Sequence, residues 1–429
     1  MSRPGQAVQR TIQAVAIRAL TTVERVQSGA AFLPMGEQFH ADPYSMYRRL
    51  REKDPVHRSR LLNGWVLTRH ADVSAVLRDP RFLADERKQV GYEKFRARAI
   101  KQGIIDADDS GTISMLRADP PDHTRLRALV SRAFTPRTVE GLRGRVEAIV
   151  NERLDSVADQ GGMDVIATLA YPLPVVIIAE MLGIPAEDHA RFKHWSDEIV
   201  RGMGISSAED GKRAHRGHRE LRAYLEGVAS ARRQEPREDL LSALLMAGEE
   251  DDRLTPDELY ETCELLLVAG HETTTNLIGN GLLALLQHPD QLDALHSDPP
   301  RIDHAIEELL RYDSPVQATT RMAQEDMPFG GRTFRKGEQV ALVLGAANRD
   351  PEQFADPDRL DVSRKEVRHV SFGHGIHFCL GAPLARLEAP IAFRAMIERF
   401  PNMRLDETMR PRWKENIILR GLEQLAVTF

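Results

Sequence analysis

Residues 372–381 of the chain read FGHGIHFCLG, and residues 382–386 continue as APLAR. The glycine-rich first part predicts a tight loop, and the second part begins a helical pattern. Cys379 would then lie at a helix N-terminus, where free N–H groups and the helix dipole favour a thiolate. Gly381 would let backbone donors approach the sulfur closely. For a cysteine taken alone, the competing interpretation is a small, buried apolar side chain.

A second stretch, residues 255–287, predicts one long helix that ends just before Pro289. Thr255 and Glu258 form a capping box around a proline at the first helical position. At 1.5 Å per residue the helix would measure about 48 Å, enough to cross a whole domain. Near its middle, residues 269–275 read AGHETTT. Glycine and threonine are poor helix formers, so we expect a local distortion there.

The glycine-rich stretch resembles the cysteine-ligand signature of the cytochrome P-450 family, F-x-x-G-x-H-x-C-x-G. The match runs through Phe372, Gly375, His377, Cys379 and Gly381. This family is known for binding haem iron through a cysteine thiolate, which favours O–O bond cleavage.

Three further segments resemble family motifs in the same order. They are residues 269–274 (AGHETT, the oxygen-activation motif), 308–311 (ELLR, the E-x-x-R pair) and 346–351 (AANRDP, the stretch after the central strand). Together with the cysteine signature they extend the resemblance over nearly the whole chain after residue 35.

The resemblance implies a mainly α fold with small β-sheets (α+β), built as one large unit whose long central helix crosses the haem. We expect residues 1–35 to form a helical N-terminal extension and residues 36–429 to form the haem domain. The implied cofactor is haem b, with Cys379 as the axial ligand of its iron.

The haem propionates need cationic partners, because buried carboxylates are costly unless paired. His123 and Arg127 lie four apart on one predicted helical face, and Arg321 and His377 match family propionate ligands. The resemblance adds Ala269, Gly270, Phe372, Gly373, Gly381 and Ala385 as further cofactor contacts.

Residues three apart on a helix share a face, so Glu308 and Arg311 could form an ordinary surface ion pair. The resemblance makes them instead a buried structural pair that is tied to the loop before Cys379.

The resemblance assigns Glu272 and Thr273 to proton management during oxygen activation. A zinc-protease pattern H-E-x-x-H fails here because position 275 is threonine. Residues expected to line the substrate cavity are mostly apolar, with Gln317 and Thr319 as polar anchors, so the substrate should be mainly hydrophobic. The predicted set is Leu265, Val268, Ala269, Gln317, Ala318, Ile417 and Ile418.

The implied reaction inserts one oxygen atom from dioxygen into a C–H bond, by hydroxylation or oxidative dealkylation. The sequence contains no fused flavin or nicotinamide domain, so electrons should come from a ferredoxin and its reductase. Arg125 and Arg132 form a candidate docking patch. Two alternatives stay open: a peroxide-driven peroxygenase, and a non-catalytic haem-binding protein of the same fold.

Composition limits the other functions. The 429 residues carry a net charge of −6, which argues against nucleic acid as a partner. Only Cys263 and Cys379 are present, and this fits a reducing cytoplasm; Cys263 should pack in the core. Charged residues interrupt the apolar N-terminus, so we expect no membrane anchor.

Short-range signals complete the prediction. Asn63-Gly64 predicts a hairpin, and residues 340–344 and 424–429 predict strands. We expect a long irregular loop over residues 86–116 and a mobile flap over 190–235.

Overall fold

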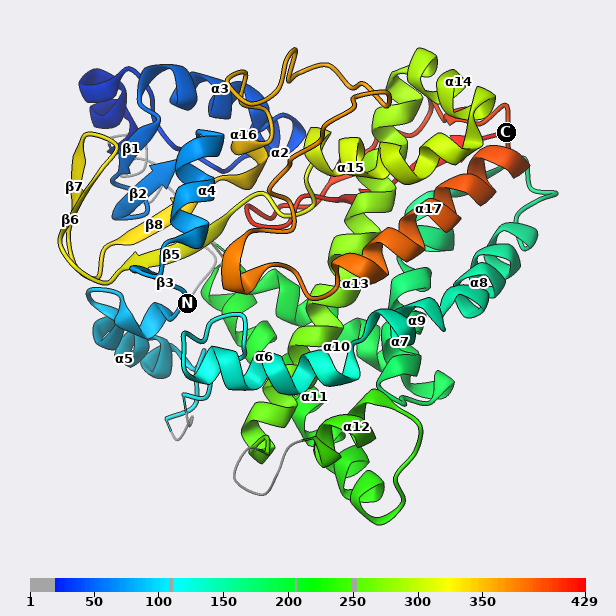
Figure 1. The fold of residues 1–429 in the computed structure, drawn as a ribbon, viewed down its shortest axis with the longest axis horizontal. Coiled ribbons are helices and arrows are strands. Elements are labelled where there is room, and N and C mark those ends of the chain that lie inside the picture. The colour runs from blue at the N-terminus through cyan, green and yellow to red at the C-terminus, as the bar shows by residue number, and fades with distance from the viewer. Residues whose placement is uncertain (1–19, 108–110, 205–206, 248–252) are drawn as a thin grey trace, which may run out of the picture.

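The computed structural model describes residues 20–107, 111–204, 207–247 and 253–429. Helices dominate it and the sheets are small, so the predicted fold class is confirmed. The larger sheet and its covering helices occupy one side of the molecule, and most of the helices pack together on the other (Figure 1).

The main α-helices follow one another along the described chain. They are α2 (Glu37–Ala41), α3 (Tyr44–Lys53), α4 (His70–Arg78), α5 (Tyr92–Gln102), α6 (Asp122–Ala133), α7 (Pro136–Glu140), α8 (Arg143–Asp155), α9 (Pro172–Met181), α10 (His189–Arg201), α11 (Ala208–Gln234), α12 (Leu240–Met246), α13 (Pro256–Gln287), α14 (Pro289–Ser297), α15 (Ile302–Tyr312), α16 (Leu344–Ala347) and α17 (Ala382–Arg399). Short 3-10 or π segments include η1 (Glu86–Lys88), η2 (Ile166–Ala170) and η5 (Gly375–His377).

The largest sheet has five strands in the order β1-β2-β8-β5-β3. Its strands are β1 (Val56–Ser59), β2 (Gly64–Leu67), β8 (Gln339–Leu342), β5 (Thr319–Ala323) and β3 (Phe82–Leu83). The smaller sheets use β4 (Gly162–Asp164), β6 (Met327–Phe329), β7 (Arg332–Phe334), β9 (Arg404–Leu405), β10 (Arg412–Trp413), β11 (Leu422–Gln424) and β12 (Ala426–Thr428).

The predicted hairpin is present. Strands β1 and β2 pair antiparallel, and Asn63 in the turn takes a positive φ of 48°. Strand β2 then runs parallel to β8, which corresponds to the strand predicted over residues 340–344. A Cβ on Gly64 would lie 2.6 Å from the backbone oxygen of Gln339, so this close approach of β2 to β8 requires glycine.

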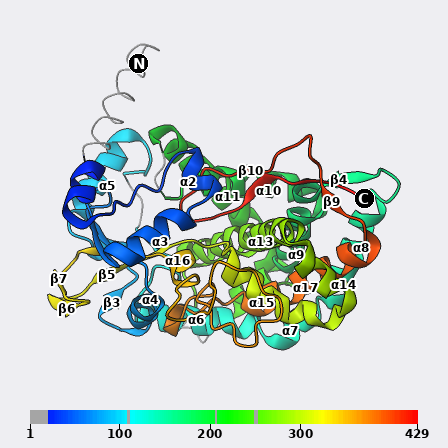
Figure 2. The same cartoon turned by 90° about the horizontal axis from the view of Figure 1, so that it is seen from above.

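Helix α13 is the central element of the helical side, and Figure 2 shows it surrounded by other helices. Its capping box is formed by Thr255 and Glu258 as predicted. The helix continues without a break through residues 269–275, so a local distortion there, as predicted, would not interrupt it. The threonine hydroxyls of Thr273 and Thr274 bond back to carbonyls one turn earlier without interrupting it.

The two predicted mobile segments are more regular than expected. Within residues 86–116, α5 forms between Gly91 and Gly103, both with positive φ, so these glycines cap a helix where we had expected loop residues. The range 190–235 is mostly α10 and α11, and the predicted break lies at Gly202 and Gly204 between them. Residues 108–110 and 205–206 lie outside the described part.

The N-terminal prediction can be followed only from residue 20. Residues 20–28 are helical, and the buried Glu24 carboxylate accepts a hydrogen bond from the Phe32 backbone and contacts His57 on β1. Residues 1–19 lie outside the described residues, and the boundary at residue 35 stays a prediction. None of the described helices is long and apolar enough to cross a membrane.

Candidate active site

Cys379 lies between η5 and α17, in the loop-then-helix arrangement that the sequence predicts. Gly373 and Gly375 both have φ of 69°, a left-handed conformation that favours glycine. A Cβ on Gly375 would lie 2.6 Å from the backbone oxygen of Leu77, so the loop also passes close to α4. The Cys379 N–H donates to the Phe372 carbonyl at 2.9 Å and closes the loop.

The sulfur of Cys379 lies among hydrogen-bond donors and cations. The backbone N–H groups of Gly381 and Ala382 donate to it, and Arg127 and Arg386 are nearby. Burial nevertheless raises the pKa of the thiol and outweighs these groups, although one side of Cys379 is accessible to solvent. The N–H groups at the helix terminus favour the thiolate as predicted, because they lower the pKa, and burial acts against them. An iron ion bound to the sulfur would add positive charge and favour the thiolate further.

One face of the central helix stays open. Leu265 and Thr273 are half-buried and Ala269 is exposed, although the residues around them on α13 are mostly buried. The three positions are spaced by four, so they form a stripe along one side of the helix. An accessible, mainly apolar stripe on an otherwise buried helix is suited to a planar apolar group.

A cluster of cationic and imidazole groups lies beside the cysteine loop. The rings of His123 and His377 are 4.3 Å apart, and the Nε2 atom of each is buried without a hydrogen-bond partner in the described structure. Burial and the charges of Arg321 and Arg127 lower the pKa of His377 to about 3. Arg321 is only 6% exposed, and Arg127 donates to the Phe378 carbonyl at 2.6 Å.

These features fit a haem. The unpartnered nitrogens and the buried arginine need anions, and two propionates would supply them. The open stripe of α13 and the accessible Cys379 sulfur offer surfaces for the ring and the iron. The structure thus brings together His123, Arg127, Arg321 and His377 as the sequence predicts. Phe372, Gly373, Gly381 and Ala385 lie on the same loop and helix start.

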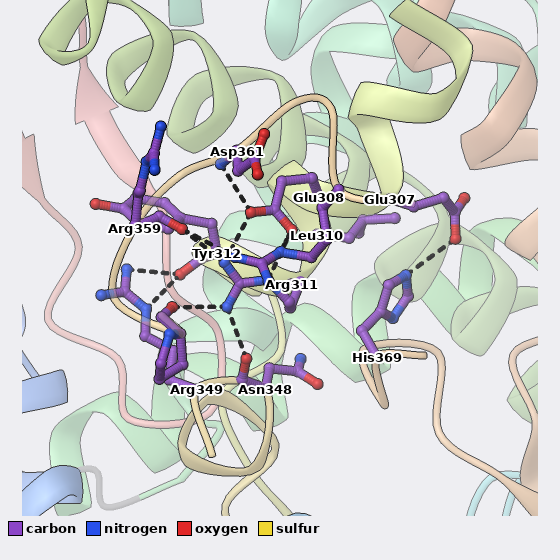
Figure 3. A network of polar contacts seen from close by, with 12 residues as sticks. Glu307, Glu308, Leu310, Arg311, Tyr312, Asn348, Arg349, Arg359, Asp361 and His369 are labelled. Carbon is purple, nitrogen blue, oxygen red and sulfur yellow. Dashed lines mark hydrogen bonds and ion pairs between the residues drawn. The ribbon is translucent and has the colours of Figure 1, made fainter. Parts of the chain in front are cut away.

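Glu308 and Arg311 form a bidentate ion pair, and both side chains are completely buried. Arg311 Nε and Nη2 lie 2.7 and 2.8 Å from the two Glu308 oxygens. Arg311 also donates to three backbone carbonyls, those of Asn348, Pro357 and Arg359 (Figure 3). The pair therefore holds α15 against the segment that leads to the cysteine loop.

Asn348 connects this pair to the loop. Its Oδ1 accepts a hydrogen bond from the Val370 N–H at 2.8 Å, and its Nδ2 donates to the hydroxyls of Ser314 and Ser371. Asn348 belongs to the AANRDP stretch, whose position the sequence analysis identified but whose bonding it did not.

Glu272 and Thr273 are consecutive on α13 but have different partners. The Thr273 hydroxyl donates to the Ala269 carbonyl at 2.9 Å. The Glu272 carboxylate, 2% exposed, forms an ion pair with Lys414 and accepts from Asn276 at 3.5 Å. Sequence reasoning missed Lys414, because no local pattern connects residues 142 positions apart.

Glu388 on α17 is a second buried acid that the sequence analysis missed. Neither of its oxygens has a hydrogen-bond partner in the described structure, although the Thr274 hydroxyl lies close by. Burial raises the pKa of this carboxyl to about 8.

The predicted substrate residues are only partly brought together. Residues 316–318 are extended next to the C-terminal segment, and Val316 bridges Leu419. Ala318 is half-buried, whereas Gln317 is buried on the opposite side and its amide donates to Ser314 and Tyr44. Gln317 is thus more buried than Ala318 and its Oε1 has no hydrogen-bond partner in the described structure, and its role as a polar substrate anchor stays a prediction.

Ile417 and Ile418 lie beside the turn between α10 and α11. A Cβ on Gly204 would be 3.0 Å from Ile417 and 3.5 Å from Ile418, and Val200 accepts a hydrogen bond from Asn416. Leu265 and Val268 lie on α13. These contacts place the α10–α11 turn over the predicted C-terminal lining residues.

Arg125 is not an exposed docking cation as predicted. It forms an ion pair with Glu258 in the first turn of α13 and is 28% exposed. Arg132, seven residues later on α6, is exposed. Cys263 is buried in the core as predicted, and burial raises the pKa of its thiol to about 12.

Comparison with known proteins gives consistent results. A family model described as Cytochrome P450 matches residues 66–421. The chain is 41% identical to the polyketide biosynthesis cytochrome P450 PksS of Bacillus subtilis, over 92% of this chain and 98% of that protein. It is 43% identical to the cytochrome P450 monooxygenase PikC of Streptomyces venezuelae, over 94% and 97%.

Among solved structures, the chain is similar to myxobacterial cytochrome P450 CYP267B1 in complex with myristic acid. The TM-score is 0.84 and the identity 42%, with 92% of this chain and 98% of that chain covered.

Proposed function

The chain belongs to the cytochrome P450 family, and we propose that Cys379 is its iron ligand while Thr273 and Glu272 handle the protons of the reaction. Like its relatives, it is a haem-thiolate monooxygenase, which inserts one oxygen atom from dioxygen into a small organic substrate with electrons from a redox partner. The bound haem supplies the activation of dioxygen. The peroxygenase and non-catalytic alternatives are not favoured, because PikC is named a monooxygenase.

The observation that carries the proposed haem site is the pair of buried, unpartnered Nε2 atoms of His123 and His377 beside Arg127 and Arg321. We assign these four side chains to the two propionates. The backbone donors of Gly381 and Ala382 then hold the Cys379 sulfur in place through its lone pairs.

Thr273 is assigned to the site of oxygen reduction because its hydroxyl lies on the open stripe of α13. When it turns away from the Ala269 carbonyl, the hydroxyl can donate its proton toward dioxygen, and its oxygen can accept one from a neighbouring acid. Glu272 is the adjacent acid. Its carboxylate is paired with Lys414, on a side of α13 other than the open stripe.

The substrate proposal is a mainly apolar molecule held by Leu265, Val268, Ala269, Ala318, Ile417 and Ile418. An apolar lining offers a substrate few hydrogen bonds that would orient it, so the shape of the cavity must select the substrate. Myristic acid, which is bound in one similar structure, is a suitable first probe.

Thr273→Ala tests the assignment with myristic acid as probe. If Thr273 delivers protons, product per NADPH consumed should fall by about tenfold or more, and hydrogen peroxide should take up the missing electrons. Thr273→Ser keeps the hydroxyl and should behave like the native protein. Equal coupling in all three proteins would contradict the role of Thr273.

The electron donor proposed is a ferredoxin reduced by its own reductase. On the outer side of the cysteine loop, Ile376 and Phe378 are 51% and 39% exposed, and Arg78 contacts His374 of the same loop. An apolar centre with cations near it suits an acidic partner that is steered by charge. Arg132 lies on α6, whose Arg127 touches this loop.

Charge reversal tests this docking surface. Arg78→Glu combined with Arg132→Glu should slow ferredoxin-dependent reduction about tenfold at low salt, and the loss should shrink as salt rises. Arg335→Glu, directly after β7 and paired with Asp326, is the control. Unchanged reduction rates in the double variant would contradict this docking surface.

A further inference from the structure

Glu307 joins three segments of the chain beside the cysteine loop. Its carboxylate, on α15, accepts two hydrogen bonds from Arg386 on α17, whose Nε and Nη2 lie 2.7 and 2.8 Å from the two oxygens. His369, in the segment that leads into the loop, places its Nε2 3.1 Å from the same carboxylate (Figure 3). The Glu307 carboxylate is therefore held from two directions next to the start of the loop.

The hydrogen bonds of His369 fix which of its nitrogens carries the proton. Nδ1 accepts a hydrogen bond from the Ser371 N–H at 3.1 Å, so Nε2 is the nitrogen that donates to Glu307. Burial raises the pKa of the Glu307 carboxyl, but the hydrogen bonds from Arg386 and His369 outweigh it and lower the pKa to about 2. Glu307 is thus a fixed anion over the whole ordinary pH range.

The Arg386 guanidinium also lies over the Phe372 ring, with Cζ 4.7 Å from the ring centroid. A guanidinium over an aromatic face gains a cation–π attraction. Phe372 is the first residue of the loop, and its carbonyl accepts the hydrogen bond from the Cys379 N–H at 2.9 Å. The bidentate pair with Glu307 and the ring of Phe372 together fix the guanidinium next to the cysteine.

The charge of Arg386 acts on the Cys379 sulfur. Burial raises the pKa of the thiol, while the backbone donors and then Arg127 and Arg386 lower it. The two arginines are held differently. Arg127 donates to the Phe378 carbonyl of the loop itself, whereas the Arg386 side chain is 42% exposed and has Glu307 as its ion-pair partner. A long, exposed side chain without such a partner samples many rotamers, so Glu307 decides where this charge lies.

We propose that Glu307 is a positioning residue of the haem site: it holds the Arg386 guanidinium on Phe372, so that its charge stays beside Cys379 and favours electron uptake by the iron. Reduction adds negative charge at a thiolate-bound iron, and a nearby cation stabilises the reduced form more than the oxidised form. This proposal rests on the proposed ligation of the iron by Cys379.

The direct test is the reduction potential of the substrate-free, haem-loaded protein, measured by spectroelectrochemical titration at low salt. Arg386→Met removes the cation, and the equilibrium constant for electron uptake should fall about threefold. Glu307→Ala should lower the potential in the same direction, because the released guanidinium moves into solvent. If Glu307 only neutralised Arg386, its removal would raise the potential instead, so the sign of the shift distinguishes the two roles.

Two further variants separate position from charge. Glu307→Asp keeps the negative charge but is one methylene shorter and cannot hold the guanidinium on Phe372, so the potential should fall here as well. In an Arg386→Met background, Glu307→Ala should lower the potential no further, because Glu307 acts through Arg386. Arg394→Met removes another exposed arginine of α17, paired with Asp303, and should leave the potential unchanged.

An unchanged or raised potential in both Glu307→Ala and Glu307→Asp would overturn the proposal, as would an equal fall in Arg394→Met. These outcomes differ from a failure of the Cys379 assignment. Every Glu307 and Arg386 variant should keep the red-shifted carbon-monoxide band of a thiolate-bound haem, and the Cys379→Ala variant tests that band separately.

Discussion

The protein contains two buried ion pairs that use similar chemistry in opposite ways. Glu308 and Arg311 are completely buried, and bonds to backbone carbonyls fix the guanidinium in place. Glu272 is equally buried, but its partner Lys414 borders a cavity and is 24% exposed. The first pair has hydrogen bonds from several chain segments and cannot open without unfolding. The second has one lysine and one amide as partners, and the lysine side chain borders solvent, so its ion pair can separate without unfolding the chain.

Arg311→Met should have the largest effect. It leaves Glu308 buried with Arg364 as its remaining cation and removes the Arg311 donor from three carbonyls, and breaking such a pair costs about 3–5 kcal/mol. Urea unfolding and the haem content per chain measure the loss. Arg335→Met, at an exposed pair with Asp326, is the control and should change stability by less than about 1 kcal/mol. A loss as small as the control's would remove the distinction between the two pairs.

Glu388→Gln extends the comparison to Glu388, a buried acid that has no cationic partner. The folded pKa is about 8 against an ordinary value of 4.5. Below the ordinary value both states are protonated. As pH rises from there to the folded pKa, the unfolded state ionises first, and the folded state loses up to about 1.4 kcal/mol per pH unit. Glutamine removes this loss, so the variant's thermal stability relative to the native protein should rise between about pH 5 and pH 8. A constant difference would show that Glu388 does not stay protonated.

Lys414→Met should have the smallest effect on folding. Glu272 can take up a proton and be solvated from the cavity, so we expect a loss below about 2 kcal/mol in urea unfolding, well under that of Arg311→Met. A loss equal to that of Arg311→Met would mean that the Lys414 pair is structural.

The features that depend on a short stretch of sequence were predicted best. The capping box at Thr255, the loop before Cys379 and the Glu308–Arg311 pair all depend on residues close together in the chain, and the structure contains each. Asn63-Gly64 predicted its hairpin for the same reason, since turn geometry is local.

Contacts between distant segments were not predictable. Lys414 reaches Glu272 and Arg125 reaches Glu258 only after the chain has folded. The Gln317 amide donates to the Ser314 carbonyl and to Tyr44, a partner 273 positions away in the chain. Helix α5 was missed because the glycines at both of its ends are typical of loops as well as of caps.

The most direct test of the central claim is the carbon-monoxide difference spectrum of the reduced protein beside a Cys379→Ala variant. Thiolate ligation by Cys379 predicts a strongly red-shifted Soret band that disappears in the variant. A band at the position of imidazole-ligated haem, or the same red-shifted band in both proteins, would contradict Cys379 as the iron ligand.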